Sequence, residues 1–145
     1  MRLVIQRVRA ASVSIEGKIH AKIKQGLLVL VGVAVSDTSK EIIFCLEKIL
    51  NLRIFEDEHQ KMNRNIQEIG GEILLVSQFT LYGDCLKGRR PSFTRSAPAH
   101  LAQPLYLDMV KRLKGKYPKV KTGVFQAFMQ VELTNDGPIT LIIDK

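Results

Sequence analysis

A short apolar run that ends in polar residues occupies the middle of the chain. Residues 73–76 read Ile-Leu-Leu-Val and follow the Gly70-Gly71 pair, which is typical of a buried strand between turn signals. Residues 77–80, Ser-Gln-Phe-Thr, then bring two hydroxyls and an amide to the end of that strand. Such a strand end is a common location for a functional site. The alternative is that the hydroxyls only bond the backbone where the strand stops.

Further strands are predicted on both sides of this run. Residues 2–8 alternate in the manner of a strand, and residues 13–23 form a hairpin around Glu16-Gly17. Residues 27–33 are a nearly continuous Leu/Val run, which predicts a central strand. The N-terminal third is therefore expected to be a meander of antiparallel strands. Residues 52–55 are a short strand candidate, and residues 56–67 are polar and predict a loop.

Two segments have helical periodicity. Thr38 followed by Glu41 has the spacing of a capping box and predicts a helix whose apolar face comprises Ile42, Ile43, Leu46, Ile49 and Leu50. Ser96 and Pro98 mark the start of a second helix, with an apolar face of Leu101, Leu105, Met109 and Leu113. Pro104 either kinks this second helix or marks its true start. Gly115 and Pro118 are expected to end it.

The last third of the chain returns to strands. Met129, Val131 and Leu133 alternate with polar residues, residues 135–137 (Asn-Asp-Gly) are expected to turn the chain, and residues 139–143 form a last strand. No linker or repeat interrupts the chain. The predicted fold class is therefore α/β (more narrowly α+β), with residues 1–145 as a single domain. Its mostly antiparallel, twisted and barrel-like sheet carries two main helices.

The net charge and the hydropathy of the chain indicate which kinds of binding partner to expect. The chain of 145 residues has 22 Lys and Arg against 14 acids, and its net charge of +8 favours a polyanionic partner such as nucleic acid. No apolar run has the length that spans a bilayer, so we expect a cytoplasmic protein and no membrane contact. Four basic residues in one segment could contact a phosphate backbone, or could lie in an ordinary solvated loop: Lys87, Arg89, Arg90 and Arg95.

Side-chain catalysis is poorly signalled. The three histidines, His20, His59 and His100, follow no triad motif, and no ligand-spaced cluster predicts a metal or another cofactor. Cys45 has the spacing of a core residue, and Cys85 has no histidine near it in sequence, so both are read as inert thiols. If the protein is an enzyme, backbone amides and the substrate itself are the expected agents.

Two separated motifs resemble one known family. Residues 77–81 (Ser-Gln-Phe-Thr-Leu) and residues 135–140 (Asn-Asp-Gly-Pro-Ile-Thr) closely resemble the signature motifs of the D-aminoacyl-tRNA deacylases. The resemblance covers the whole chain, including residues 6–8, 53–55, 61–63 and 90–93. From pattern alone, Gly137-Pro138 is a hairpin turn. The resemblance implies instead a cis bond at this position.

The resemblance also implies an activity and a set of roles. It implies an editing hydrolase that cleaves D-aminoacyl-tRNA, and also glycyl-tRNA, as a homodimer with active sites at the subunit interface. The backbone amides of Phe79 and Thr80 would stabilise the oxyanion, and the 2′-hydroxyl of the tRNA would activate water. The turn of the partner subunit would exclude L-amino acids. The remaining implied residues are Ser77, Gln78, Phe125 and Met129 around the substrate, Gly137 and Pro138 in the turn, and Arg7 and Asn135 supporting it.

Two other functions stay open from the residues. One is a basic RNA-binding module without catalysis. The other is a small-ester hydrolase that uses Thr80 or Cys85 as its nucleophile and acts without RNA. Nothing in the sequence supplies a base for Thr80.

Overall fold

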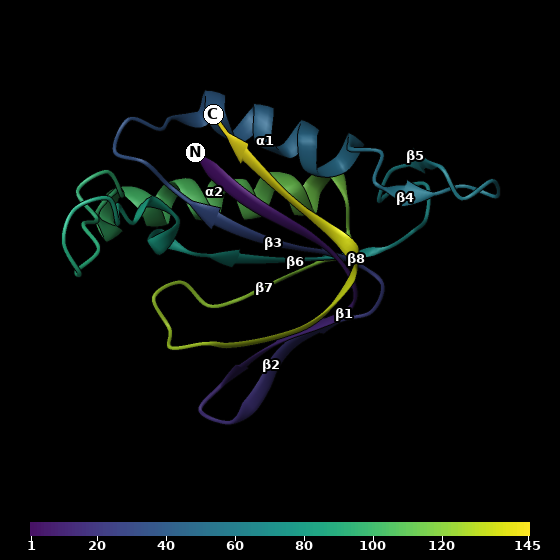
Figure 1. Cartoon of the computed structure of the whole chain (residues 1–145), viewed down its shortest axis with the longest axis horizontal. Coiled ribbons are helices and arrows are strands. Elements are labelled where there is room, and N and C mark those ends of the chain that lie inside the picture. Colours follow the sequence, from purple (N-terminus) through teal and green to yellow (C-terminus); the bar gives the residue numbers. More distant parts are fainter.

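The computed structural model describes all 145 residues, and the chain forms one strongly curved sheet with two helices against it (Figure 1). The six-stranded sheet has the order β2-β1-β3-β6-β7, and β8 pairs with β1. A separate two-stranded sheet joins β4 and β5. The elements in chain order are β1 (Arg2–Ile15), β2 (Lys18–Ile23), β3 (Gly26–Gly32), α1 (Ser39–Asn51), β4 (Phe55–Glu56), β5 (Met62–Arg64), β6 (Glu72–Ser77), the 3-10 helix η1 (Phe79–Tyr82), α2 (Ala99–Lys116), β7 (Val120–Thr122) and β8 (Gln130–Asp144).

The two central strands divide their side chains between two hydrophobic clusters. On β3, Leu27 and Val29 face the larger cluster, which includes the buried residues of both helices, whereas Leu28 belongs to a smaller cluster. On β6, Ile73 and Leu74 are divided in the same way. Strand side chains alternate between the two faces of a sheet, so both faces of β3 and β6 are covered. This confirms the expectation of buried central strands at both apolar runs.

The sheet order differs from the predicted meander. β2 and β3 both pair antiparallel with β1, β2 along its C-terminal part and β3 along its N-terminal part. The predicted strand 2–8 and the first arm of the hairpin are therefore one continuous strand, β1. β3–β6 and β6–β7 are parallel pairs, while the three pairs of β1 are antiparallel. The fold class is confirmed as two helices on a nearly closed, barrel-like sheet.

The predicted turn at residues 135–137 is wrong. β8 continues past these residues, and both of its halves pair antiparallel with β1 (Figure 1). Gln6 is opposite Thr140 and Val8 is opposite Asn135, so residues 136–139 bulge out across from Arg7. The Asn-Asp-Gly-Pro segment therefore forms a protruding turn within one strand, and it does not reverse the chain.

The helices confirm the predicted start signals and correct both apolar faces. In α1, Ile43 is exposed, contrary to prediction, and Cys45 is buried beside the other predicted residues. Thr38 caps α1 and forms the capping box with Glu41. In α2, Met109 and Leu113 are buried as predicted, but Leu101 is exposed and the face is completed by Ala102 and Tyr106. The α2 helix begins at Ala99 and continues through Pro104, so this proline does not mark its start.

The segment between α1 and β6 is more structured than its composition indicates. The predicted strand at 52–55 is wrong except at Phe55, because the observed strand is Phe55–Glu56. This strand pairs with Met62–Arg64, inside the stretch that was expected to be loop. In Figure 1 this β4–β5 hairpin lies at the opposite end of the molecule from the loop that follows η1.

Candidate active site

The C-terminal end of β6 opens into a pocket of about 780 Å³. Most of the residues that line this pocket are hydrophobic. Five of the predicted substrate-site residues lie around it: Ser77, Gln78, Phe79, Phe125 and Met129. The last two come from the loop between β7 and β8, so the fold brings together segments that are nearly 50 positions apart in sequence. A mainly apolar pocket with a few polar groups at one side is typical of a small-molecule site.

The backbone at the pocket mouth offers hydrogen-bond donors. Phe79 and Thr80 are the first residues of the single-turn helix η1, so their amides have no carbonyl acceptor within that helix. The next amide, that of Leu81, already donates to the carbonyl of Gln78. Thr80, unlike Phe79, is not among the residues that line the pocket, and its hydroxyl accepts a hydrogen bond from the Gln78 side-chain amide.

The pocket contains no general base. Tyr106 is the only titratable residue in its lining, and its hydroxyl donates to the Leu75 carbonyl at 3.0 Å. Burial raises the pKa of Tyr106 well above its usual value, so the phenol stays protonated. No group of three or more His, Cys, Asp and Glu side chains is placed to hold a metal ion. The chemistry that this pocket can supply is therefore hydrogen bonding and the exclusion of water.

The two cysteines differ in exposure. Cys45 is buried in the larger core, as predicted, and burial raises the pKa of its thiol to about 11. Cys85 is exposed and does not line the pocket. A thiol that stays protonated at neutral pH is a poor nucleophile, so Cys45 is a structural residue.

The Gly137-Pro138 turn lies elsewhere in the same chain. The peptide bond between these two residues is cis. Gly137 lines a second pocket of about 630 Å³, together with Arg7 and Asp136, and no residue lines both pockets. One copy of the chain therefore does not place the turn in the pocket at the end of β6.

Arg7 and Asn135 hold this turn. Arg7 is only 5% exposed, and its guanidinium donates to the Asp136 carbonyl at 3.0 Å and to the Ile54 carbonyl at 2.7 Å. The guanidinium also lies 3.4 Å from the Asp136 carboxylate and 3.7 Å from that of Glu56. The side-chain amide of Asn135 donates to the carbonyls of Arg7 and Ile139, at 3.0 and 3.1 Å. The turn is therefore bonded at both of its ends.

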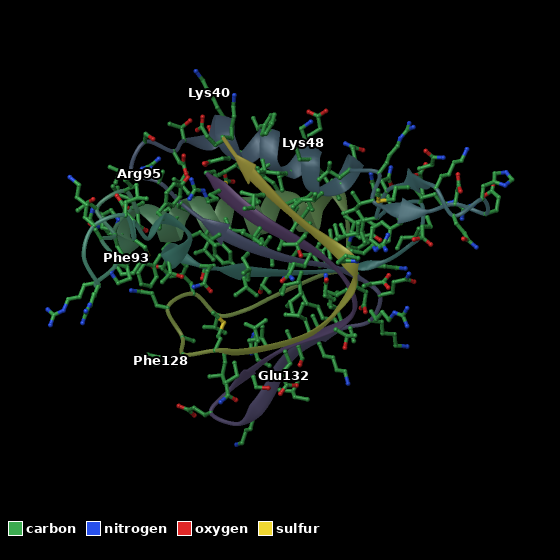
Figure 2. The ribbon with its side chains drawn as sticks, viewed as in Figure 1. Lys40, Lys48, Phe93, Arg95, Phe128 and Glu132 are labelled. Atoms are coloured by element: carbon green, nitrogen blue, oxygen red, sulfur yellow. The ribbon has the colours of Figure 1, made fainter.

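The basic segment forms an exposed arm beside the pocket. We call residues 84–95 the basic arm. Its base is closed by two backbone hydrogen bonds between Asp84 and Ser92, of 2.7 and 2.9 Å. Lys87, Arg89 and Arg90 are exposed and make no ion pair within the chain. Both of the predicted alternatives, a phosphate-binding loop and a solvated loop, agree with this. Figure 2 shows Arg95, Phe93 and Phe128 at one end of the molecule.

Aromatic residues at the pocket mouth were missed as individual site residues. Phe93 lines the pocket and packs edge-to-face on Phe79, with 5.2 Å between the ring centroids. Phe128 also lines the pocket and is 98% exposed. An aromatic residue that directly follows a basic, proline-containing loop was the available signal for Phe93. The sequence held no comparable signal for Phe128.

Comparison with known proteins identifies the family. The sequence matches the D-Tyr-tRNA(Tyr) deacylase family over residues 4–144. The chain belongs to this family. A D-aminoacyl-tRNA deacylase of Thermosipho africanus (strain TCF52B) is 56% identical over 145 residues, which is all of this chain and 97% of the relative. A D-aminoacyl-tRNA deacylase of Clostridioides difficile (strain 630) is 54% identical with the same coverage.

Solved structures share the fold. A structure described as c-Myc DNA Unwinding Element Binding Protein superposes with a TM-score of 0.95 at 40% identity and covers 100% of this chain and 99% of its own. A probable eukaryotic D-amino acid tRNA deacylase superposes with a TM-score of 0.83 at 18% identity, over 99% of this chain and 98% of its own, and this likeness concerns the fold alone. None of the helices in the present chain combines the length and hydropathy that a membrane-spanning helix needs.

Proposed function

We propose that this chain is a D-aminoacyl-tRNA deacylase, which hydrolyses the ester of D-aminoacyl-tRNA to free amino acid and tRNA. The observation that carries the proposal is the full-length family match, since the chain is 53–56% identical from end to end to relatives named for this activity. The net charge of +8 suits a tRNA substrate. A cytoplasmic location and action without a cofactor remain predictions.

Catalysis in this proposal uses backbone amides and the substrate. Water adds to the ester carbonyl, the amides of Phe79 and Thr80 stabilise the tetrahedral oxyanion, and the ribose 3′-oxygen then leaves with a proton. The neighbouring 2′-hydroxyl activates the water. The absence of acceptors for these two amides within η1, and of a general base in the pocket lining, supports this assignment. An aminoacyl ester is already activated, so the barrier to be lowered is modest.

Selectivity in this proposal requires a second copy of the chain. In a homodimer with active sites at the interface, the Gly137-Pro138 turn of each subunit enters the partner's pocket. Its two carbonyl oxygens then face the α-carbon of the bound amino acid. An L side chain collides with them, whereas a D-amino acid presents hydrogen there. Glycine has no side chain to exclude, so glycyl-tRNA is also cleaved. The separation of turn and pocket within one chain supports this arrangement.

The basic arm is assigned to the RNA. Lys87, Arg89, Arg90 and Arg95 are exposed on the basic arm, whose Phe93 lines the pocket, and they would neutralise phosphates of the single-stranded 3′ end. Phosphate contacts position the RNA without reading its sequence. This fits an enzyme that accepts many tRNAs.

The decisive experiment is deacylation of matched D- and L-tyrosyl-tRNA, together with a D-tyrosyl-tRNA that carries a terminal 2′-deoxyribose. Fast cleavage of the D-ester alone, lost without the 2′-hydroxyl, is the expected result. D-selective cleavage that persists without this hydroxyl would indicate that a side chain, such as that of Thr80 or Cys85, acts as the nucleophile. If neither ester is cleaved faster than in buffer, the deacylase proposal fails.

A second candidate function is nucleic-acid binding without catalysis. The description of one solved structure at 40% identity as a DNA-binding protein favours it, as does the unpaired charge of the basic arm. This candidate predicts that tRNA binds normally and that its ester is unaffected. The same deacylation assay therefore separates the two functions.

A further inference from the structure

The ring of Phe93 is placed to restrain Phe79. The two rings pack edge-to-face, with 5.2 Å between centroids and 64° between planes. This is the favourable geometry for an aromatic pair. Phe79 is 58% exposed in one copy of the chain, so few other residues of that copy pack against it. The helix that begins at Phe79 is a single turn without a side-chain cap at its N-terminus. The neighbouring backbone is bonded, since the Gln78 amide donates to the Val31 carbonyl at 2.7 Å, but the Phe79 amide itself has no backbone acceptor. Packing of the Phe79 side chain therefore contributes to the direction of this amide.

Phe93 itself has a fixed position. Its ring lies against the backbone of Gly83, where a Cβ would be only 2.9 Å from the Phe93 Cε1 atom. The two hydrogen bonds between Asp84 and Ser92 close the basic arm immediately before Phe93, and the Ser96 amide donates to the Phe93 carbonyl at 3.0 Å. The chain then continues to Ala97, whose amide donates to the carbonyl of Val33 at 2.8 Å. Phe93 is thus attached to the sheet through backbone bonds on its C-terminal side.

We infer that Phe93 is a positioning residue, which holds Phe79 so that its backbone amide is directed at the developing oxyanion. The inference rests on the proposed deacylase function. A donor that stabilises an oxyanion must be held near 3 Å from where the charge develops, and a displacement of about 1 Å costs much of its effect. The ring of Phe93 therefore acts on the rate of the chemical step. A contact with RNA would act on affinity instead.

The test separates kcat from KM in D-tyrosyl-tRNA deacylation. Phe93→Ala should lower kcat roughly three- to ten-fold, the range that an aromatic pair is worth, and should leave KM unchanged. Phe93→Tyr keeps the ring and should restore kcat, because the half-exposed position leaves room for a hydroxyl. Leu86→Ala is the matched control, since Leu86 lies on the same arm, is 92% exposed and does not line the pocket. It should leave both constants unchanged.

Two results would overturn the inference while leaving the deacylase function intact. They are an unchanged kcat in Phe93→Ala and a rise in KM alone. A rise in KM alone would indicate stacking on a base of the RNA. If the wild-type chain itself fails to cleave D-tyrosyl-tRNA, the proposed function fails first, so the two failures are distinguishable.

Discussion

Replacing Arg7 by methionine tests whether its guanidinium fastens the Gly137-Pro138 turn to the body of the fold. Methionine keeps an apolar stem of similar length, so the change removes mainly the polar contacts. Two of these are hydrogen bonds from a buried charged donor, to the carbonyls of Asp136 and Ile54. Each such bond contributes at least about 1.5 kcal/mol. The ion pairs with Asp136 and Glu56 involve carboxylates that are 21% and 54% exposed, and together they add at most about 1 kcal/mol.

We therefore expect Arg7→Met to lower the free energy of unfolding by about 3–4 kcal/mol, against a total of roughly 5–15 kcal/mol for a domain. With a urea slope of about 2 kcal/mol per M, the unfolding midpoint should fall by about 1.5–2 M. The assay is urea unfolding followed by circular dichroism. It should be run at two protein concentrations, because dimerisation would make the midpoint concentration-dependent.

Arg9→Met provides the matched control, because Arg9 pairs with the same carboxylate of Asp136 at 3.0 Å but is 75% exposed. Its loss should cost less than about 1 kcal/mol. If the two substitutions lower the free energy of unfolding equally, the buried hydrogen bonds of Arg7 do not stabilise the turn more than an exposed ion pair does. Arg7→Met should also weaken the preference for D- over L-tyrosyl-tRNA, whereas Arg9→Met should preserve it.

Three further substitutions test the site and the fold. Gly137→Ala would place a Cβ 2.7 Å from the Ile139 amide nitrogen, so the turn must shift. The rate of D-tyrosyl-tRNA cleavage should therefore fall at least about ten-fold. Thr80→Ala keeps the backbone amide and should retain kcat within about three-fold; a loss of a thousand-fold or more would make the hydroxyl a nucleophile. A hydrogen bond from the backbone amide of Lys24 lowers the pKa of Glu72 below its usual value of 4.5. The ionised carboxylate therefore stabilises the fold above pH 4.5, and this stabilisation is lost as the pH falls through the lowered pKa of the folded state. In urea titrations, the deficit of Glu72→Gln should therefore be largest at neutral pH and vanish in acid; a constant deficit would contradict the assignment.

The elements that sequence predicted well are those whose signals are local. The capping box of Thr38 and Glu41 lies within four residues, and α1 begins where that spacing placed it. The apolar face of α2 was assigned from the four-residue spacing of its large aliphatic side chains, which included Leu101. The fold instead buries Ala102, whose small side chain allows close packing, and Tyr106, whose hydroxyl finds the Leu75 carbonyl. Burial of a tyrosine depends on a partner that periodicity cannot show.

The largest error concerns the turn predicted at residues 135–137. Its local composition is that of a turn, but its strand partner lies at the other end of the sequence. Asn-Asp-Gly-Pro at residues 135–138 has the composition of a hairpin turn, and a hairpin would pair the two flanking segments with each other. Both segments pair with β1 instead, because that strand offers a longer edge from the other end of the chain. For the same reason, only the family resemblance could place Phe125 and Met129 beside Ser77. Their proximity is produced by the loop that precedes β8.

The pairing of β1 with β8 has a consequence for the order of events during synthesis. Arg2 and Asp144 are opposite each other although they are 142 residues apart in sequence. At ribosomal rates of about 5–20 residues per second, one edge of β1 stays without its partner for roughly 7–28 s after the strand has been made. An unpaired, largely apolar strand edge is a template for association with other chains. We therefore expect the nascent protein to depend on chaperone capacity in this interval, and its yield to fall steeply when translation slows before β8.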